Sequence, residues 1–149
     1  MLSKARIGTH PIHTMLVAYP LGLWTTAVVF DAVAKLTNRP WLHIPAYYMI
    51  LAGCVGAVAA AIPGLIDLFG VTQPDSPARR TGWIHALLNI SALVIFAFGE
   101  YTRHQRHNTI SPAGYYTDAI GLVLIAISGW LGGALVYDHK VGVPYTDVR

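Results

Sequence analysis

Four long runs of apolar residues, separated by shorter polar stretches, dominate the hydrophobicity pattern of this chain. The runs cover about residues 14–34, 46–68, 83–99 and 117–137. Each run is long enough to cross the hydrocarbon core of a bilayer, which takes about 17 to 25 helical residues. The pattern predicts an all-α protein of four transmembrane helices. Connections of moderate length favour an up-down-up-down bundle, in which the N- and C-termini lie on the same side.

Composition supports this interpretation and restricts the function. The 149 residues are 54% hydrophobic and only 11% charged, whereas charged residues make up roughly 25% of an average soluble domain. We therefore expect one integral membrane domain over residues 1–149, with lipid as its main surroundings. The net charge of +3 is scattered, so nucleic acid is not an expected partner. The single cysteine, Cys54, excludes an intrachain disulfide, and no strong internal repeat is evident.

Several side chains within the runs have predicted roles in the bundle itself. Pro20 predicts a kink in the first helix, because proline removes a backbone donor. Asp31 is expected to pair with Lys35, one helical turn later. Aromatic side chains are expected at the two membrane–water boundaries. These are Trp24, Trp41, Trp83, Trp130, Tyr47, Tyr48, Tyr115 and Tyr116.

The predicted topology brings polar residues that are distant in sequence to one end of the bundle. The first and third helices begin at the end that holds the N-terminus, and the second and fourth helices finish there. The polar residues expected at this end are His10, His13, Asp67, Arg79, Arg80, His85, Asp138 and His139. Lysine and arginine are slightly more numerous here than at the other end, which favours termini in the cytoplasm.

Short motifs in all four runs form a combination that is similar to a known family. They are His10–His13 with Leu16, Pro20 and Gly22, then Asp31, Ile62–Asp67, His85–Asn89, Ser128–Gly133 and Val136–Tyr137. This combination, spread over nearly the whole chain, resembles the bacterial family called domain of unknown function 2231. Thr14 departs from the pattern, since the family often has a second proline there.

The resemblance implies a four-helix protein of the bacterial inner (cytoplasmic) membrane. Some members of the family carry a Rieske-type iron–sulfur domain in the same chain, which implies redox work. With one cysteine, this chain holds no such domain. The family name assigns no activity, so whether the protein is an enzyme stays open.

The leading functional hypothesis is a membrane electron-transfer protein that holds haem b. His13 begins the first helix and His85 lies in the first turn of the third. In an up-down bundle these two helices are parallel and diagonal, so their imidazoles are placed to ligate a haem from opposite faces. Quinone or an iron–sulfur protein would be the redox partner. The residues expected to replace or support this pair are His10, His139, Asn89, Arg79 and Arg80.

Two other hypotheses use the same features. The first is a single Zn, Cu or Fe ion held by a sensor or an enzyme, because three nitrogens and a carboxylate suit these metals. Its candidate ligands are His10, His13, His85, His139 and Asp67. The second is a non-catalytic transport or assembly subunit, with glycine-rich helix faces that form a homodimer. No nucleophile–base pair was found, so no catalytic residue is predicted.

A second haem at the opposite end is a weaker variant of the first hypothesis. Its candidate ligands are His43, His104 and His107. His104 and His107 are expected in a loop, beside Arg103 and Arg106.

Overall fold

The computed structural model describes residues 2–104, 110 and 112–143. A small antiparallel hairpin precedes the helices, with Ile7 paired to His10. The elements in chain order are β1 (Arg6–Ile7), β2 (His10–Pro11), α1 (Ile12–Leu16), α2 (Ala18–Thr37), the 3₁₀ helix η1 (Pro40–Leu42), α3 (His43–Val71), α4 (Pro77–His104) and α5 (Pro112–Tyr137).

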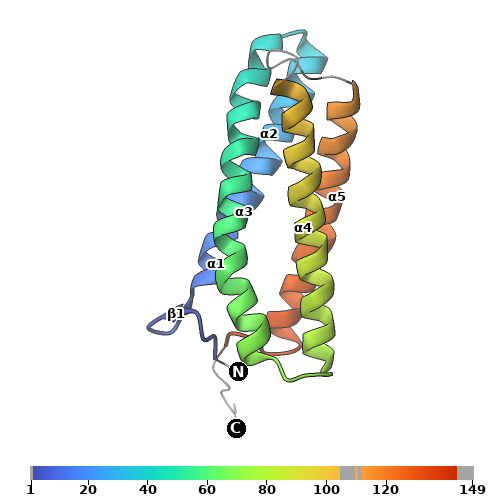
Figure 1. The fold of residues 1–149 in the computed structure, drawn as a ribbon. Helices are drawn as coiled ribbons and strands as arrows, with labels where there is room; N and C mark the ends of the chain where they lie inside the picture. Colours follow the sequence, from blue (N-terminus) through green and yellow to red (C-terminus); the bar gives the residue numbers. More distant parts are fainter. Residues whose placement is uncertain (1, 105–109, 111, 144–149) are drawn as a thin grey trace.

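The four long helical segments lie side by side as a bundle (Figure 1). By length and composition, each is able to cross a membrane: 12–37, 40–71, 77–104 and 112–137. The predicted class of four packed, membrane-length helices is therefore confirmed. The helices extend beyond the apolar runs because polar residues continue them into the interfacial region.

The early start of α4 shows how polar residues lengthen a helix. Pro77 is its first residue, where the missing N–H costs nothing and the fixed φ suits a helix. The Ser76 hydroxyl accepts a hydrogen bond from the backbone N–H of Arg79 at 3.1 Å, which is the bond of an N-cap. Helix α4 thus begins six residues before the apolar run that starts at Trp83.

The predicted disturbance at Pro20 is a local irregularity at Val17, which separates α1 from α2 but keeps helical φ and ψ. Helix α1 ends at Leu16 and α2 begins at Ala18. Pro20 has no N–H to donate to the carbonyl of Leu16, and its ring crowds that carbonyl. The short α1 carries His13 as its second residue and continues into α2 through Val17.

Packing between the helices fixes which of them are diagonal. Helix α2 contacts α3 and α5, and helix α4 also contacts α3 and α5. The pair formed by α2 and α4 therefore lies across the centre of the bundle. At the end that holds the hairpin, Leu2 pairs with Gly142 through a β-bridge, so the two ends of the described chain meet.

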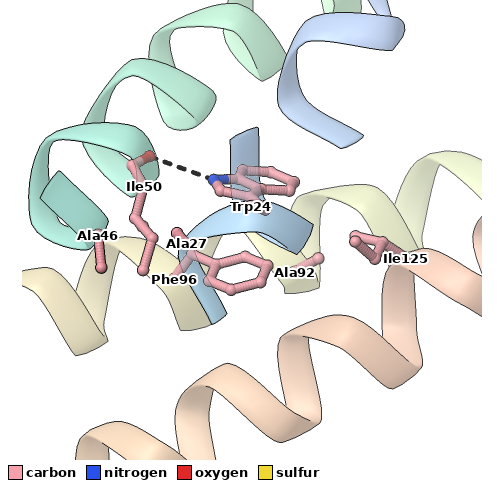
Figure 2. Close-up of a cluster of buried hydrophobic side chains, with 7 residues drawn as sticks. All are labelled: Trp24, Ala27, Ala46, Ile50, Ala92, Phe96 and Ile125. Carbon is pink, nitrogen blue, oxygen red and sulfur yellow. Dashed lines mark hydrogen bonds between the residues drawn. The ribbon is translucent and has the colours of Figure 1, made fainter. Parts of the chain in front are cut away.

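The core is a small cluster in the middle of the bundle (Figure 2). Its buried members are Trp24, Ala27, Ala46, Ile50, Ala92, Phe96 and Ile125. The Trp24 ring stacks on Phe96, with 4.6 Å between centroids, and its Nε1–H donates to the Ile50 carbonyl at 3.2 Å. The expected place of Trp24 in an aromatic belt is wrong, because its side chain is 2% exposed. Trp41, Trp83 and Trp130 are exposed.

Glycines give the two stacked rings their space. A Cβ at Gly53 would lie 2.5 Å from Nε1 of Trp24, and one at Gly121 would lie 2.5 Å from Cζ of Phe96. Each ring therefore rests directly on the backbone of a neighbouring helix. This arrangement explains two of the small residues in α3 and α5.

We predict that Gly121→Ala destabilises the bundle by about 1–3 kcal/mol, the usual cost of overpacking. The added methyl group must displace the rigid Phe96 ring. The matched control is Gly129→Ala on the same helix, where a Cβ meets open space. The control should be neutral or stabilising, because glycine in a helix costs about 1 kcal/mol relative to alanine. Denaturant unfolding in detergent measures both, and equal stabilities would contradict the prediction.

Candidate functional site: a histidine pair across the bundle

His13 reaches from α1 onto the surface of α3. Its Nδ1 is 2.8 Å from the backbone carbonyl oxygen of Ala60. One turn later stands Gly64, where a Cβ would lie 2.8 Å from the same Nδ1. Pro63 lies between these two positions, and proline loosens the helical turn that precedes it. The sequence of α3 thus provides both a carbonyl group and the space for the imidazole.

His85 lies in the same way between α4 and α5. Its Nδ1 is 2.9 Å from the carbonyl oxygen of Ser128, and a Cβ at Gly132 would lie 3.1 Å from its Cε1. Asn89, one turn further along α4, donates from Nδ2 to the Ser128 hydroxyl at 2.6 Å. It also donates to the carbonyl of His85 at 2.8 Å. Asn89 therefore ties α4 to α5 beside the ring.

The two imidazole rings meet across the bundle. Their centroids are 6.1 Å apart, and the ring planes are nearly perpendicular at 85°. A backbone carbonyl only accepts hydrogen bonds, so the Nδ1 atoms of His13 and His85 carry the hydrogen in these contacts. Each Nε2 is then the unprotonated nitrogen of its ring, and Nε2 of His85 uses its lone pair to accept from Asn89. Nδ2 of Asn89 is 3.2 Å from Nε2 of His85, which agrees with an unprotonated Nε2.

Asp67 lies at the same end of the bundle but has a different role. Its Oδ2 accepts from the Ser3 hydroxyl at 2.6 Å. Its Oδ1 accepts from the backbone N–H groups of Lys4 at 2.8 Å and Ala5 at 3.1 Å. The carboxylate is thus satisfied by the N-terminal segment, which it fastens to the end of α3.

The remaining predicted site residues are also placed apart from the two rings. His139 is 3.3 Å from the Thr81 hydroxyl through Nε2. Arg79 donates to the carbonyl of Thr72 at 2.7 Å. His10, in β2, and Arg80 are exposed. Within the described residues, no three side chains of His, Cys, Asp or Glu are grouped to hold a metal ion.

Of the predicted site, the structure therefore brings together His13, His85 and Asn89. The weaker candidates for a second haem are separately engaged. His43 contacts Asp31 at 2.6 Å, and Nδ1 of His104 is 3.4 Å from the Tyr47 hydroxyl. His107 lies outside the described residues.

A buried ionic cluster at the opposite end was not predicted. It consists of Asp31, His43, Glu100, Arg103 and Asp118, which come from all four long helices and are each less than a tenth exposed. Asp31 pairs with Arg103 at 2.5 Å and with His43. The guanidinium also lies 3.3 Å from Glu100 and 3.8 Å from Asp118.

The predicted pair of Asp31 with Lys35 is wrong. Asp31 faces the interior of the bundle, where the guanidinium of Arg103 and the imidazole of His43 reach it. Lys35 is exposed, and its Nζ lies 4.5 Å above the ring of Tyr115. Sequence spacing identifies only pairs on the same helix, and therefore favoured Lys35. Arg103 is 72 positions away from Asp31 and is brought to it by the fold.

The two halves of the chain repeat one structural unit. In the first half, an imidazole bonds to a carbonyl one turn before Gly64. In the second half, an imidazole bonds to a carbonyl one turn before Gly132. Trp24 rests on Gly53 as Phe96 rests on Gly121. The bundle therefore consists of two similar helical hairpins.

Equivalent residues of the two hairpins meet at three levels along the bundle. The meeting pairs are His13 with His85, Trp24 with Phe96, and Asp31 with Arg103. Members of each pair are 72 positions apart in sequence. When a residue contacts its own equivalent in the other hairpin, the two residues lie next to an approximate two-fold axis that relates the hairpins. The histidine pair and the ionic cluster are the two ends of this axis.

Comparison with known proteins places the chain in a family. The model of a family described as predicted membrane protein DUF2231 matches residues 9–144. The chain belongs to the DUF2231 family. No curated protein and no solved structure gives a significant match.

The sequence of this DUF2231 protein does contain a trace of the repeat. Ile12 and His13 recur as Ile84 and His85, and the tyrosine pair 47–48 recurs as 115–116. Gly53 and Gly64 recur as Gly121 and Gly132. Helix α3 and helix α5 align with a shift of 68 positions instead of 72. The two halves share few identical residues, and the spacing between equivalent positions changes along the chain. A search for a single repeat length therefore does not detect the repeat.

We predict that Asp67→Ala releases the N-terminal segment without unfolding the bundle. The N–H groups of Lys4 and Ala5 lose their acceptor, and a hydrogen bond to a charged group contributes about 1.5–3 kcal/mol. Hydrogen exchange of these two amides should therefore speed up, while exchange in the core stays slow. Asp138→Ala, which removes an exposed carboxylate at the same end, is the control. Unchanged protection of the two amides would show that other contacts hold the segment.

Proposed function

We propose that this DUF2231 protein binds haem b between His13 and His85 and transfers electrons in the bacterial cytoplasmic membrane. The observation that carries the proposal is the pair of facing imidazoles, each with Nδ1 fixed on a backbone carbonyl. Histidines that ligate metals almost always donate their other ring N–H in this way. The chain thus presents two oriented nitrogen donors across its axis.

The distance between the rings supports this function. Two imidazoles that would hold one metal ion between them must lie close together, because a metal–nitrogen bond is only about 2 Å long. The measured separation is 6.1 Å.

The number of donors favours haem over a bare metal ion. Structural zinc takes four protein ligands and catalytic zinc three. Within the described residues only two histidines meet, and no third His, Cys, Asp or Glu joins them. A haem iron needs only two axial ligands, because the porphyrin supplies the other four.

Small residues line the helices next to the rings. Ala60 and Gly64 lie beside His13, and Ser128 and Gly132 lie beside His85. The two glycines let each imidazole lie directly against the backbone of the neighbouring helix. Arg80 is exposed about one and a half turns before His85 and is proposed to pair with a propionate.

The bound haem would supply one-electron chemistry. The chain binds and orients it through the two imidazoles, and the carbonyls of Ala60 and Ser128 keep each ring in the Nδ1–H form. Quinone or an iron–sulfur protein is the proposed redox partner. Termini in the cytoplasm belong to the same proposal.

An absorption spectrum of gently purified protein tests this function. We expect a Soret band with one haem per chain, shifted on reduction. His13→Ala and His85→Ala should each remove the band, because one axial ligand is lost. His10→Ala and His139→Ala should keep it, since neither residue contacts the pair. Protein from haem-sufficient cells that lacks a Soret band would refute the proposal, and one Zn, Cu or Fe per chain by elemental analysis would then support the metal-ion hypothesis.

We also predict that Asn89→Ala weakens haem binding by about 10- to 100-fold, the usual effect of losing a supporting hydrogen bond behind a metal ligand. Asn89 holds Ser128, whose carbonyl fixes the ring of His85. Titration of apoprotein with haem measures the dissociation constant. Thr81→Ala, at the same end of α4 but bonded to His139, should leave it unchanged. Equal constants for the wild type and Asn89→Ala would show that Asn89 serves only helix packing.

A further inference from the structure

The ionic cluster contains more carboxyl groups than cations. Three carboxyl groups, from Asp31, Glu100 and Asp118, surround the single guanidinium of Arg103. Among the described residues in contact with these carboxyl groups, His43 is the other group that is able to become positive. Even with His43 protonated, the cluster keeps one excess negative charge unless a carboxyl group holds a proton. Unpaired charge within a membrane-spanning bundle is costly.

The hydrogen bonds of the cluster indicate where a proton is missing. Asp31 is satisfied, because Oδ1 accepts from Nδ1 of His43 and Oδ2 accepts from Arg103. In contrast, Oε2 of Glu100 and Oδ2 of Asp118 have no hydrogen-bond partner among the described residues. These two side chains are only 6% and 4% exposed. A buried polar atom without a partner costs free energy comparable to a lost hydrogen bond.

One proton resolves both problems. The carboxyl groups of Asp31 and Asp118 both approach the same nitrogen, Nη2 of Arg103, at 2.5 Å and 3.8 Å through their Oδ2 atoms. Two carboxyl groups form a hydrogen bond only when one of them carries a proton, because carboxylates only accept. A proton on Oδ2 of Asp118 thus gives this unpartnered atom a hydrogen to donate toward Asp31, and it removes the excess charge. A metal cation is a poorer occupant, since the described residues contain no group of three ligands arranged to hold one.

We propose that Asp31, His43, Glu100, Arg103 and Asp118 form a proton-binding site in which Asp118 and Asp31 share an exchangeable proton. Glu100 is the second acceptor, on the other side of the guanidinium. The site lies at the opposite end of the bundle from the histidine pair and does not depend on haem.

The site lies at the end of the bundle where α3 begins. His43 is the first residue of α3, and its ring contacts Tyr115 at 6.2 Å between centroids. Lys35 covers the same tyrosine ring. The imidazole of His43 therefore lies between Asp31 and the ring of Tyr115, at the start of α3.

Infrared spectroscopy of the purified full chain in lipid nanodiscs tests the proposal. The carbonyl stretch of a protonated carboxyl group is separate from the bands of carboxylates, and it shifts in D₂O when the proton exchanges. We expect such a band in the wild type at neutral pH, lost reversibly in alkaline buffer. Asp118→Asn should remove it, because the amide mimics the protonated acid without a titratable proton. Glu100→Gln should keep the Asp118 band.

Asp67→Asn is the matched control, because Asp67 is a carboxylate fully satisfied by donors at the other end of the bundle. It should leave the band unchanged. If Asp118→Asn does not fold, wild-type protein carrying ¹³C-carboxyl aspartate gives the answer, since an aspartic acid band must shift with the label. A wild type without a protonated carboxyl band, or a band unaffected by both Asp118→Asn and the label, would refute the proposal. The cluster would then be a static ion network. The presence or absence of a Soret band does not affect these outcomes.

Discussion

The close approach of the two diagonal helices is the constraint on which the rest of this structure depends. Trp24 and Phe96 stack at the centre, and each ring lies against the backbone of a glycine on a neighbouring helix. With lipid outside, no gain from hiding apolar surface from water holds such helices together, so close van der Waals packing must do it. This contact sets the spacing that brings His13 to His85 at one end and Asp31 to Arg103 at the other.

Much of this architecture was predictable because it follows from local rules. Apolar runs of membrane length predicted the helices, and antiparallel order placed His13 and His85 at the same end on diagonal helices. Pro20 marked the irregularity between α1 and α2. The assignment of a cofactor to the histidine pair stays a prediction. The sequence pattern placed Asp67 with the histidine pair as a candidate metal ligand. In the structure its partners are the hydroxyl of Ser3 and two backbone N–H groups, which a sequence pattern does not reveal.

The ionic cluster shows why the remainder could not be predicted. Its members are isolated charges at the ends of four different runs, and their pairing depends on rotations of helices about their own axes. The turn spacing of Asp31 and Lys35 suggested a local pair, but the rotation of α2 points Asp31 inward. Trp24 illustrates the same limit. Its type favoured the membrane boundary, whereas the missing side chain of Gly53 on another helix gives it a place in the core.

The salt bridge between Asp31 and Arg103 has a consequence for how this fold is able to vary. Two identical hairpins around a two-fold axis would set an aspartate against an aspartate, or an arginine against an arginine. Joining both hairpins in one chain lets the two positions diverge, so that opposite charges face each other on the axis. A single chain that contains both hairpins is therefore able to place different residues at the two positions. A symmetric dimer of chains half as long is not able to do so. The histidine end, by contrast, has kept the same residue on both sides.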